Sequence, residues 1–113
     1  VWQRLPKSLR LQTEFAAVYG RLLLLAQEHD QAETLLRHAL KENWSPITVE
    51  LYGLAAPGDR QAQLKQVQRW LQDHPDDAEV HLALGRISLR NELWGQARDH
   101  FLRSIKLHPT PAA

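Results

Sequence analysis

The sequence predicts an all-α fold, a stack of three antiparallel helical hairpins, and two observations support this prediction. The first is an internal repeat, because Gly20, Gly53 and Gly85 lie in apolar helical patterns at spacings of 33 and 32 residues, a period typical of helical repeat proteins. Four pairs of residues also match at an offset of 65: Gly20 and Gly85, Ala32 and Ala97, Leu36 and Phe101, and Ala39 and Ser104. The second observation is that apolar residues recur at i, i+3, i+4 and i+7 through six segments, whereas no segment alternates long enough to predict a strand.

The first hairpin is predicted from helices near 13–28 and 30–43. In the first helix the recurring apolar residues are Phe15, Val18, Tyr19, Leu22, Leu23 and Ala26. In the second helix they are Ala32, Leu35, Leu36, Ala39 and Leu40. We assign both sets to the core, because an amphipathic helix buries its apolar face. Asp30 is expected to cap the second helix, since a carboxylate at a helix start accepts hydrogen bonds from free backbone N–H groups.

The second hairpin is predicted from helices near 46–55 and 59–73. Pro46 favours a helix start, because proline is tolerated in the first turn. The sequence Ala56-Pro57-Gly58 indicates the turn between the two helices, and Asp59 is expected to cap the second of them. The apolar positions are Ile47, Leu51, Leu54 and Ala55, followed by Leu64, Val67 and Leu71.

The third hairpin is predicted from helices near 76–90 and 93–107. Asp76 and Glu79 have the spacing of a capping box, which indicates a helix start at Asp76. The apolar positions are Val80, Ala83, Leu84 and Ile87, then Trp94, Ala97, Phe101 and Ile105. Prolines, which cannot continue a helix, follow the fourth and sixth helices at Pro75 and Pro109.

Composition excludes several classes of function. The 113 residues suit a single domain over 1–113, and a net charge of +1 provides no field to attract nucleic acid or an anionic membrane. The absence of cysteine excludes disulfides and thiolate catalysis. The chain contains no Met and opens at Val1, so we expect it to be a fragment of a longer protein. Its longest apolar run, Leu22–Ala26, is far shorter than the roughly 20 residues of a membrane span, so we expect these residues themselves to make no membrane contact.

The residue types that could carry chemistry are better explained by structure. No two of the six histidines stand four residues apart, which is the spacing of a helical metal site. The serines have no nearby His and Asp that would form a catalytic triad. We therefore predict no enzymatic activity, no metal site and no cofactor. His81 is expected to pack in place of an aromatic residue. Trp44, Trp70 and Trp94 are expected to lie in the core, with Trp94 between two helices of one hairpin, and Trp2 to be exposed.

The third repeat resembles the tetratricopeptide motif, W-x2-L-G-x2-Y followed by A-x3-F and P. The matching residues are Leu84, Gly85, Ala97, Phe101 and Pro109, while His81 and Ser88 replace the Trp and the Tyr of the motif. The first repeat keeps Gly20 and Ala32, and the middle repeat is degenerate. The resemblance implies a right-handed α-solenoid with repeats about 13–45, 46–77 and 78–111, preceded by a helical lead-in over 1–12.

A narrower resemblance covers most of the chain. The matching segments are Trp2 to Arg10, Ala39 to Trp44, Leu51 to Leu54, Trp70 to Ala78, Leu84 to Arg86, Leu89 to Asn91, Leu93 to Arg98 and Pro109 to Pro111. Together they resemble the HemY family of bacterial haem-biosynthesis-associated proteins. The resemblance implies a protein anchored in the bacterial inner membrane by segments outside this chain, with a role linked to late protohaem synthesis. It also implies that the present residues form its soluble repeat domain.

In helical repeat stacks the first helix of each hairpin lines a concave surface that commonly binds a partner. By the repeat register, we predict that a partner-binding groove is formed by Arg21, Leu24, Leu25, Glu50, Leu54, Leu82, Arg86, Leu89 and Arg90. Leucines off the core face beside arginines suit an extended or helical peptide with apolar and acidic groups. The alternative explanation is that these long side chains only shield neighbouring helices.

These observations predict a protein–protein interaction scaffold. The expected partner is another protein or peptide, with an enzyme of haem biosynthesis as a candidate. The alternative is direct binding of a tetrapyrrole, either haem or a porphyrin, by His and Arg side chains. We also expect self-association through an open face of the last helix near Phe101, Leu102 and Ile105, because a terminal repeat normally needs a polar cap.

Overall fold

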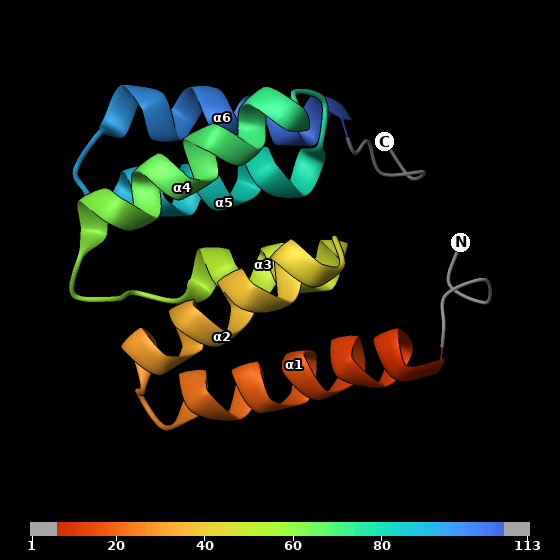
Figure 1. Ribbon diagram of the computed structural model, residues 1–113. Coiled ribbons are helices and arrows are strands. Elements are labelled where there is room, and N and C mark those ends of the chain that lie inside the picture. The colour runs from red at the N-terminus through yellow and green to blue at the C-terminus, as the bar shows by residue number, and fades with distance from the viewer. Residues whose placement is uncertain (1–6, 108–113) are drawn as a thin grey trace.

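The computed structural model describes residues 7–107, with side chains from residue 12 onward. The helices are α1 (Lys7–Leu25), α2 (His29–Glu42), α3 (Pro46–Leu54), α4 (Arg60–Asp73), α5 (Ala78–Arg90) and α6 (Trp94–Leu107) (Figure 1). No strand occurs among these residues, so the predicted all-α class is confirmed. The bounds of the last five helices agree with prediction to within about two residues, the usual uncertainty of helix ends. α1 begins at Lys7, so residues 7–12 of the predicted lead-in continue into the first helix, while residues 1–6 and Pro109 lie outside the described residues.

Two helices begin with an aspartate cap. The side chain of Asp59 accepts a hydrogen bond from the backbone N–H of Ala62 at 3.0 Å, as predicted for the start of α4. α5 is capped by Asp77, whose carboxylate accepts from the N–H of Glu79 at 2.9 Å. The prediction that Asp76 caps this helix is therefore wrong, because α5 begins one residue later than the capping-box spacing indicated.

The start of α2 differs more from the prediction. The residue before this helix is Glu28, which makes no side-chain capping bond. Asp30 instead accepts a hydrogen bond from the backbone N–H of Gly58 at 2.8 Å, and the neighbouring His29 ring nitrogen Nδ1 accepts one from the N–H of Ala56 at 2.9 Å. These two side chains therefore fasten the start of α2 to the connection between α3 and α4.

α1 packs against α2 and α3, α2 packs against α3, and α5 packs against α3, α4 and α6. Figure 1 shows α1 to α3 in the lower part of the molecule and α4 to α6 in the upper part. The predicted middle hairpin does not form closely, because α3 ends at Leu54 and residues 55–59 run without helical structure before α4. α3 and α4 consequently make little contact with each other. α3 instead meets α5, where a Cβ on Gly53 would lie 2.9 Å from Ala83.

Glycines 65 residues apart have the same function in the first and third hairpins. A Cβ on Gly20 would lie 2.8 Å from Leu36 of α2, and a Cβ on Gly85 would lie 2.5 Å from the ring of Phe101 of α6. In each hairpin the missing side chain lets the second helix approach closely. Gly53 is not equivalent to these two, because it faces a helix of the next hairpin.

The buried face of α1 agrees only in part with the one predicted. Its buried residues are Ala16, Gly20 and Leu23, and Ala17 and Leu24 are half-buried beside them. Of the residues predicted for the core, Leu23 is buried as predicted, whereas Phe15, Val18, Tyr19, Leu22 and Ala26 are exposed. The small residues face α2 and α3 because they allow close approach of the helix backbones.

The core extends from α1 to α5, and the largest of its fully buried side chains is Tyr52 of α3. The Tyr52 hydroxyl donates a hydrogen bond to Glu33 at 2.6 Å. Burial, and secondly this bond, raise the pKa of Tyr52, so the phenol stays protonated. Trp44 and Trp70 pack against this core as predicted. Trp94 is 62% exposed, so its predicted packing is wrong.

Leu93, the residue before Trp94, packs against the core in its place. Trp94 is the first residue of α6, and its ring therefore lies at an exposed helix end. Phe101 is half-buried and packs on Gly85, so it is not part of an open face of α6. Leu102 and Ile105 are 51% and 64% exposed, as the predicted open face requires.

Candidate protein-interaction face

The nine residues predicted for the groove lie on α1, α3 and α5, three helices that contact one another in that order. None of the nine is buried. The exposed ones are Arg21, Leu25, Leu54 and Leu89, and the half-buried ones are Leu24, Glu50, Leu82, Arg86 and Arg90. Other residues of the same three helices are buried in the core. Each helix therefore packs with one face and presents another face that a partner could reach. We call these nine residues the α1–α3–α5 face.

Leucines give this face its apolar character. Leu25, Leu54 and Leu89 are 76%, 43% and 46% exposed, and each lies in the last turn of its helix. Leu24 contributes less, because it packs against the core. Exposed leucines on three contacting helices form a surface that can bury apolar side chains of a partner.

Arg90 does not have the role predicted for it. Its guanidinium donates hydrogen bonds to the backbone carbonyl of Ala55 at 2.8 Å and to that of Gly53. These carbonyls belong to the C-terminal end of α3, where the helix has no partners of its own for them. Burial lowers the pKa of Arg90, and the charges of Arg86 and Arg60 lower it further. Arg90 is therefore a structural cap for α3 and is not free to bind a partner.

Arg86 is the remaining cation of α5 on this face. Its Nη1 atom is buried and has no hydrogen-bond partner among the described residues. Its charge lowers the pKa of Arg90, so the guanidinium groups of Arg86 and Arg90 repel each other. A carboxylate supplied by a partner to the accessible part of the Arg86 guanidinium would reduce this repulsion.

The structure also contains two hollows that sequence reasoning missed. One is a polar hollow of about 520 Å³ between α2 and α4, with Glu33, Arg37, Gln63 and Arg69 among its lining residues. The other is an apolar hollow of about 370 Å³ between α1 and α2, and it includes Leu35 and His38. Neither is lined by residues of the α1–α3–α5 face. The turn Ala56-Pro57-Gly58, which separates α4 from α3, is the only sequence signal that bears on the first hollow.

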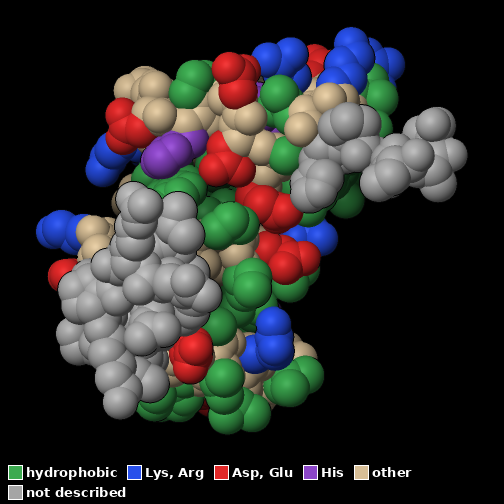
Figure 2. All heavy atoms as spheres, turned by 90° about the vertical axis from the view of Figure 1, so that its right-hand side faces the viewer, with side chains coloured by type: hydrophobic (Ala, Val, Ile, Leu, Met, Phe, Trp, Pro, Cys, Tyr) green, Lys and Arg blue, Asp and Glu red, His purple; other side chains and the backbone are tan. Residues whose placement is uncertain are grey.

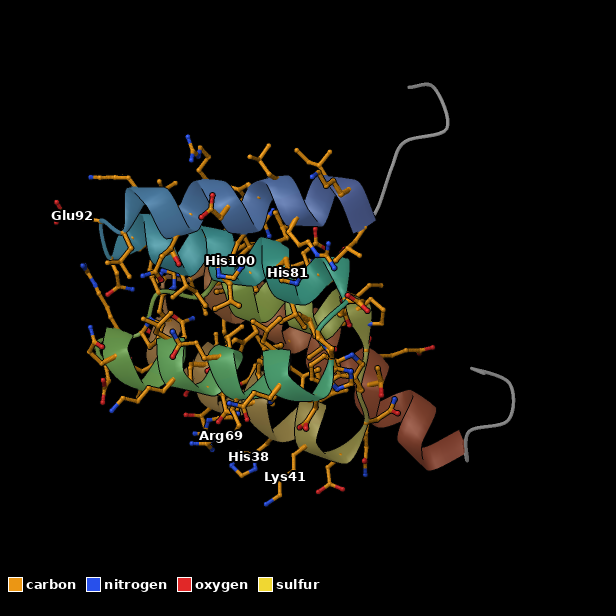
Figure 3. All side chains as sticks on the ribbon, turned by 90° about the horizontal axis from the view of Figure 1, so that it is seen from above. His38, Lys41, Arg69, His81, Glu92 and His100 are labelled. Carbon is orange, nitrogen blue, oxygen red and sulfur yellow. The ribbon has the colours of Figure 1, made fainter. Side chains whose placement is uncertain are left out.

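Two of the histidines form a pair between α5 and α6 (Figure 3). His81 Nδ1 lies 3.1 Å from His100 Nδ1, and His81 Nε2 donates to the carbonyl of Pro75 at 2.8 Å. His81 is buried, which confirms its predicted packing role. Burial, and secondly the neighbouring His81, lower the pKa of His100. Within the described residues, no three acidic or histidine side chains are placed to hold a metal ion.

Comparison with protein-family models, curated proteins and solved structures found no match to this chain. The tetratricopeptide and HemY resemblances therefore remain predictions from the sequence motifs. Among residues 7–107, no helix combines the length and the apolar character that crossing a bilayer requires.

Proposed function

We propose that this chain is a protein-binding module that holds a segment of a partner along the α1–α3–α5 face. One observation supports the proposal: none of the nine predicted residues is buried, although they come from three helices separated in sequence. The stacked arrangement of hairpins that we propose makes the face continuous, because α3 contacts both α1 and α5.

The chemistry of the face defines the partner. Leu25, Leu54 and Leu89 require apolar side chains, and Arg21 with Arg86 favours acidic ones. An extended or helical peptide that carries both kinds of side chain satisfies these requirements. The contact set is thus the predicted one without Arg90, which holds α3.

The HemY resemblance suggests where to look for the partner. If the chain belongs to a protein anchored in a bacterial inner membrane, enzymes of late protohaem synthesis are the first candidates. Their exposed acidic and apolar segments are the part that would occupy the face.

Photo-crosslinking tests the proposal. A photoreactive amino acid replaces Leu89, and in a matched variant it replaces Gln68, which is exposed on α4 away from the face. In an extract of the producing organism, we expect a discrete crosslinked species from position 89 and none from position 68. Equal crosslinking from both positions, or none from position 89, would contradict the proposal.

Charge reversal gives a second readout with the same extract. Arg86→Glu is expected to abolish the crosslink from position 89, because it removes the partner's ionic contact. Arg98→Glu introduces the same charge change on α6, where the side chain is 77% exposed, and is expected to leave the crosslink unchanged. Circular dichroism of both variants verifies that the fold is retained.

A further inference from the structure

The face of α1 that points away from the rest of the chain is apolar. Phe15, Val18, Tyr19 and Leu22 are 62%, 58%, 42% and 56% exposed, and we call them the α1 stripe. Their spacing places them along one side of the helix, and the rings of Phe15 and Tyr19 are in contact with centroids 5.4 Å apart. Figure 2 shows hydrophobic side chains gathered along the lower edge of the molecule, the edge at which Figure 1 places α1.

The equivalent residues of the third hairpin indicate how the α1 stripe could be covered. Adding 65 to each residue number of the α1 stripe gives Val80, Ala83, Leu84 and Ile87 of α5, and all four are at most 1% exposed. In α5 these positions are covered because the helix packs against α3 and α4. α1 therefore presents a face that, at the equivalent position in the fold, another helix covers.

We propose that a second copy of this chain covers the α1 stripe, with the two α1 helices packed antiparallel about a twofold axis near Val18. A twofold interface uses the same patch on both partners, so the α1 stripe supplies apolar surface to both sides. With 19 residues, α1 is about 28 Å long, which is sufficient for a helix pair to bury the whole stripe. Of the residues of the α1–α3–α5 face, this interface uses only Arg21.

Charges beside the α1 stripe favour the antiparallel orientation. Glu14 and Arg21 are exposed, and their separation of seven residues places them on the same flank of the stripe. In an antiparallel pair with its axis near Val18, Glu14 of one copy faces Arg21 of the other, and the contact occurs twice. In a parallel pair the twofold axis runs along the helices, so the charged flanks of the two copies lie on opposite sides of the interface and these ion pairs do not form.

Analytical ultracentrifugation over a wide concentration range tests the proposal on the complete chain. We expect a reversible monomer–dimer equilibrium for the unmodified protein and a monomer for Val18→Glu, which places a charge at the centre of the interface. Ile105→Glu makes the same change on α6, at an exposed residue of the face through which the sequence predicted self-association. Since the dimer proposed here uses α1, Ile105→Glu is expected to leave it intact. Circular dichroism shows whether each variant is folded.

Charge exchange then tests the orientation. Glu14→Arg alone and Arg21→Glu alone are each expected to weaken the dimer about threefold to tenfold, since two exposed ion pairs are lost. The double variant is expected to regain the original affinity.

A monomer at every concentration would overturn the proposal and leave the α1 stripe to a different protein. Dissociation by Ile105→Glu and not by Val18→Glu would also overturn it, in favour of association through α6, and failure of the double variant would overturn the antiparallel arrangement. Val18→Glu should leave the crosslink from position 89 unchanged, so the two proposals can fail separately.

Discussion

At Gly85 the ring of Phe101 lies so close that there is no room for a side chain. The same relation exists between Gly20 and Leu36 in the first hairpin. In both hairpins, therefore, a glycine of the first helix lets a large apolar side chain of the second helix approach closely. Packing of this kind is sensitive to a single added methyl group.

We predict that Gly85→Ala lowers the free energy of unfolding by about 1–2 kcal/mol. Overpacking typically costs about 1–3 kcal/mol, and the better helix propensity of alanine returns up to about 1 kcal/mol. Gly95→Ala is the control, because a Cβ there meets nothing within 4 Å, and it should raise the stability by roughly 0.5–1 kcal/mol. Urea unfolding measures both. Adding Phe101→Leu should recover part of the loss in Gly85→Ala, and an alanine variant as stable as the parent would contradict the proposed contact.

The contact between His81 and His100 makes stability depend on pH. Only one of the two facing Nδ1 atoms can carry a proton, so the two rings cannot both be charged at 3.1 Å. Burial already lowers the pKa of His100 in the folded state. The unfolded chain therefore binds more protons than the folded one below the ordinary histidine pKa of about 6.5, and stability falls as the pH decreases through that value.

We predict that His100→Gln reduces this acid sensitivity. The melting temperature of the parent should decrease between neutral pH and about pH 5, and that of His100→Gln should decrease less. His38→Gln replaces an exposed histidine of α2 and should keep the slope of the parent. Thermal melts at several pH values give the comparison, and equal slopes for the parent and His100→Gln would show that the pair does not control the effect.

Most helices could be predicted from the sequence, because apolar periodicity and proline positions are local signals. Their faces and ends could not always be predicted. The α1 stripe has ideal helical spacing, yet it is exposed, because small residues on the other side of α1 allow closer packing. The roles of Asp30 and Arg90 were also hidden. Asp30 bonds to Gly58, and Arg90 bonds to Gly53 and Ala55, so both contacts join residues far apart in the sequence.

For the candidate face, the positions that the repeat register selected on α1, α3 and α5 are exposed or half-buried. It could not separate a residue that binds a partner from one that caps a helix. Arg86 and Arg90 differ by one turn of α5, but only Arg90 reaches the end of α3. This distinction depends on α3 ending at Leu54, earlier than a full-length repeat helix would.

We predict that Arg90→Leu destabilises the protein by roughly 1.5–3 kcal/mol, the usual contribution of a hydrogen bond to a charged group. The carbonyl of Gly53 loses its donor, and that of Ala55 keeps the hydrogen bond from Gln63 Nε2 at 2.8 Å but loses the one from Arg90, so the end of α3 should become more mobile. Arg90→Lys, which retains the charge but not the two-pronged geometry, should be intermediate. Arg98→Leu, on the exposed side of α6, should change stability by less than about 0.5 kcal/mol. Chemical denaturation measures the free energy of unfolding of each variant. Equal free energies for Arg90→Leu and Arg98→Leu would disprove the capping role of Arg90.

The two halves of the molecule, α1 to α3 and α4 to α6, are joined at several places. At one end, Asp30 and Arg90 hold the connection that follows α3. At the other, Trp44 stacks on His74 with a centroid distance of 3.9 Å and donates a hydrogen bond to Asp77 at 3.3 Å. Between them, α3 packs against α5. These contacts fix α5 relative to α1 and α3. The α1–α3–α5 face therefore depends on them to be one surface.

We predict that Trp44→Leu weakens the junction and lets the halves open separately. In repeat folds, stability is approximately the sum of each unit and its interface with the next, so loss of the junction should affect the end with fewer interfaces. Among the described helices, α1 and α2 pack mainly against each other and α3, whereas α5 is packed by α3, α4 and α6. Hydrogen exchange measured on peptides should show loss of protection in α1 and α2, with α5 and α6 nearly unchanged, because local opening proceeds in such contiguous units. His38→Gln is a suitable comparison on the exposed side of α2. A uniform loss of protection from α1 to α6 would show that the chain opens as one unit, and the Trp44 contacts would then stabilise the whole molecule and not a junction between its halves.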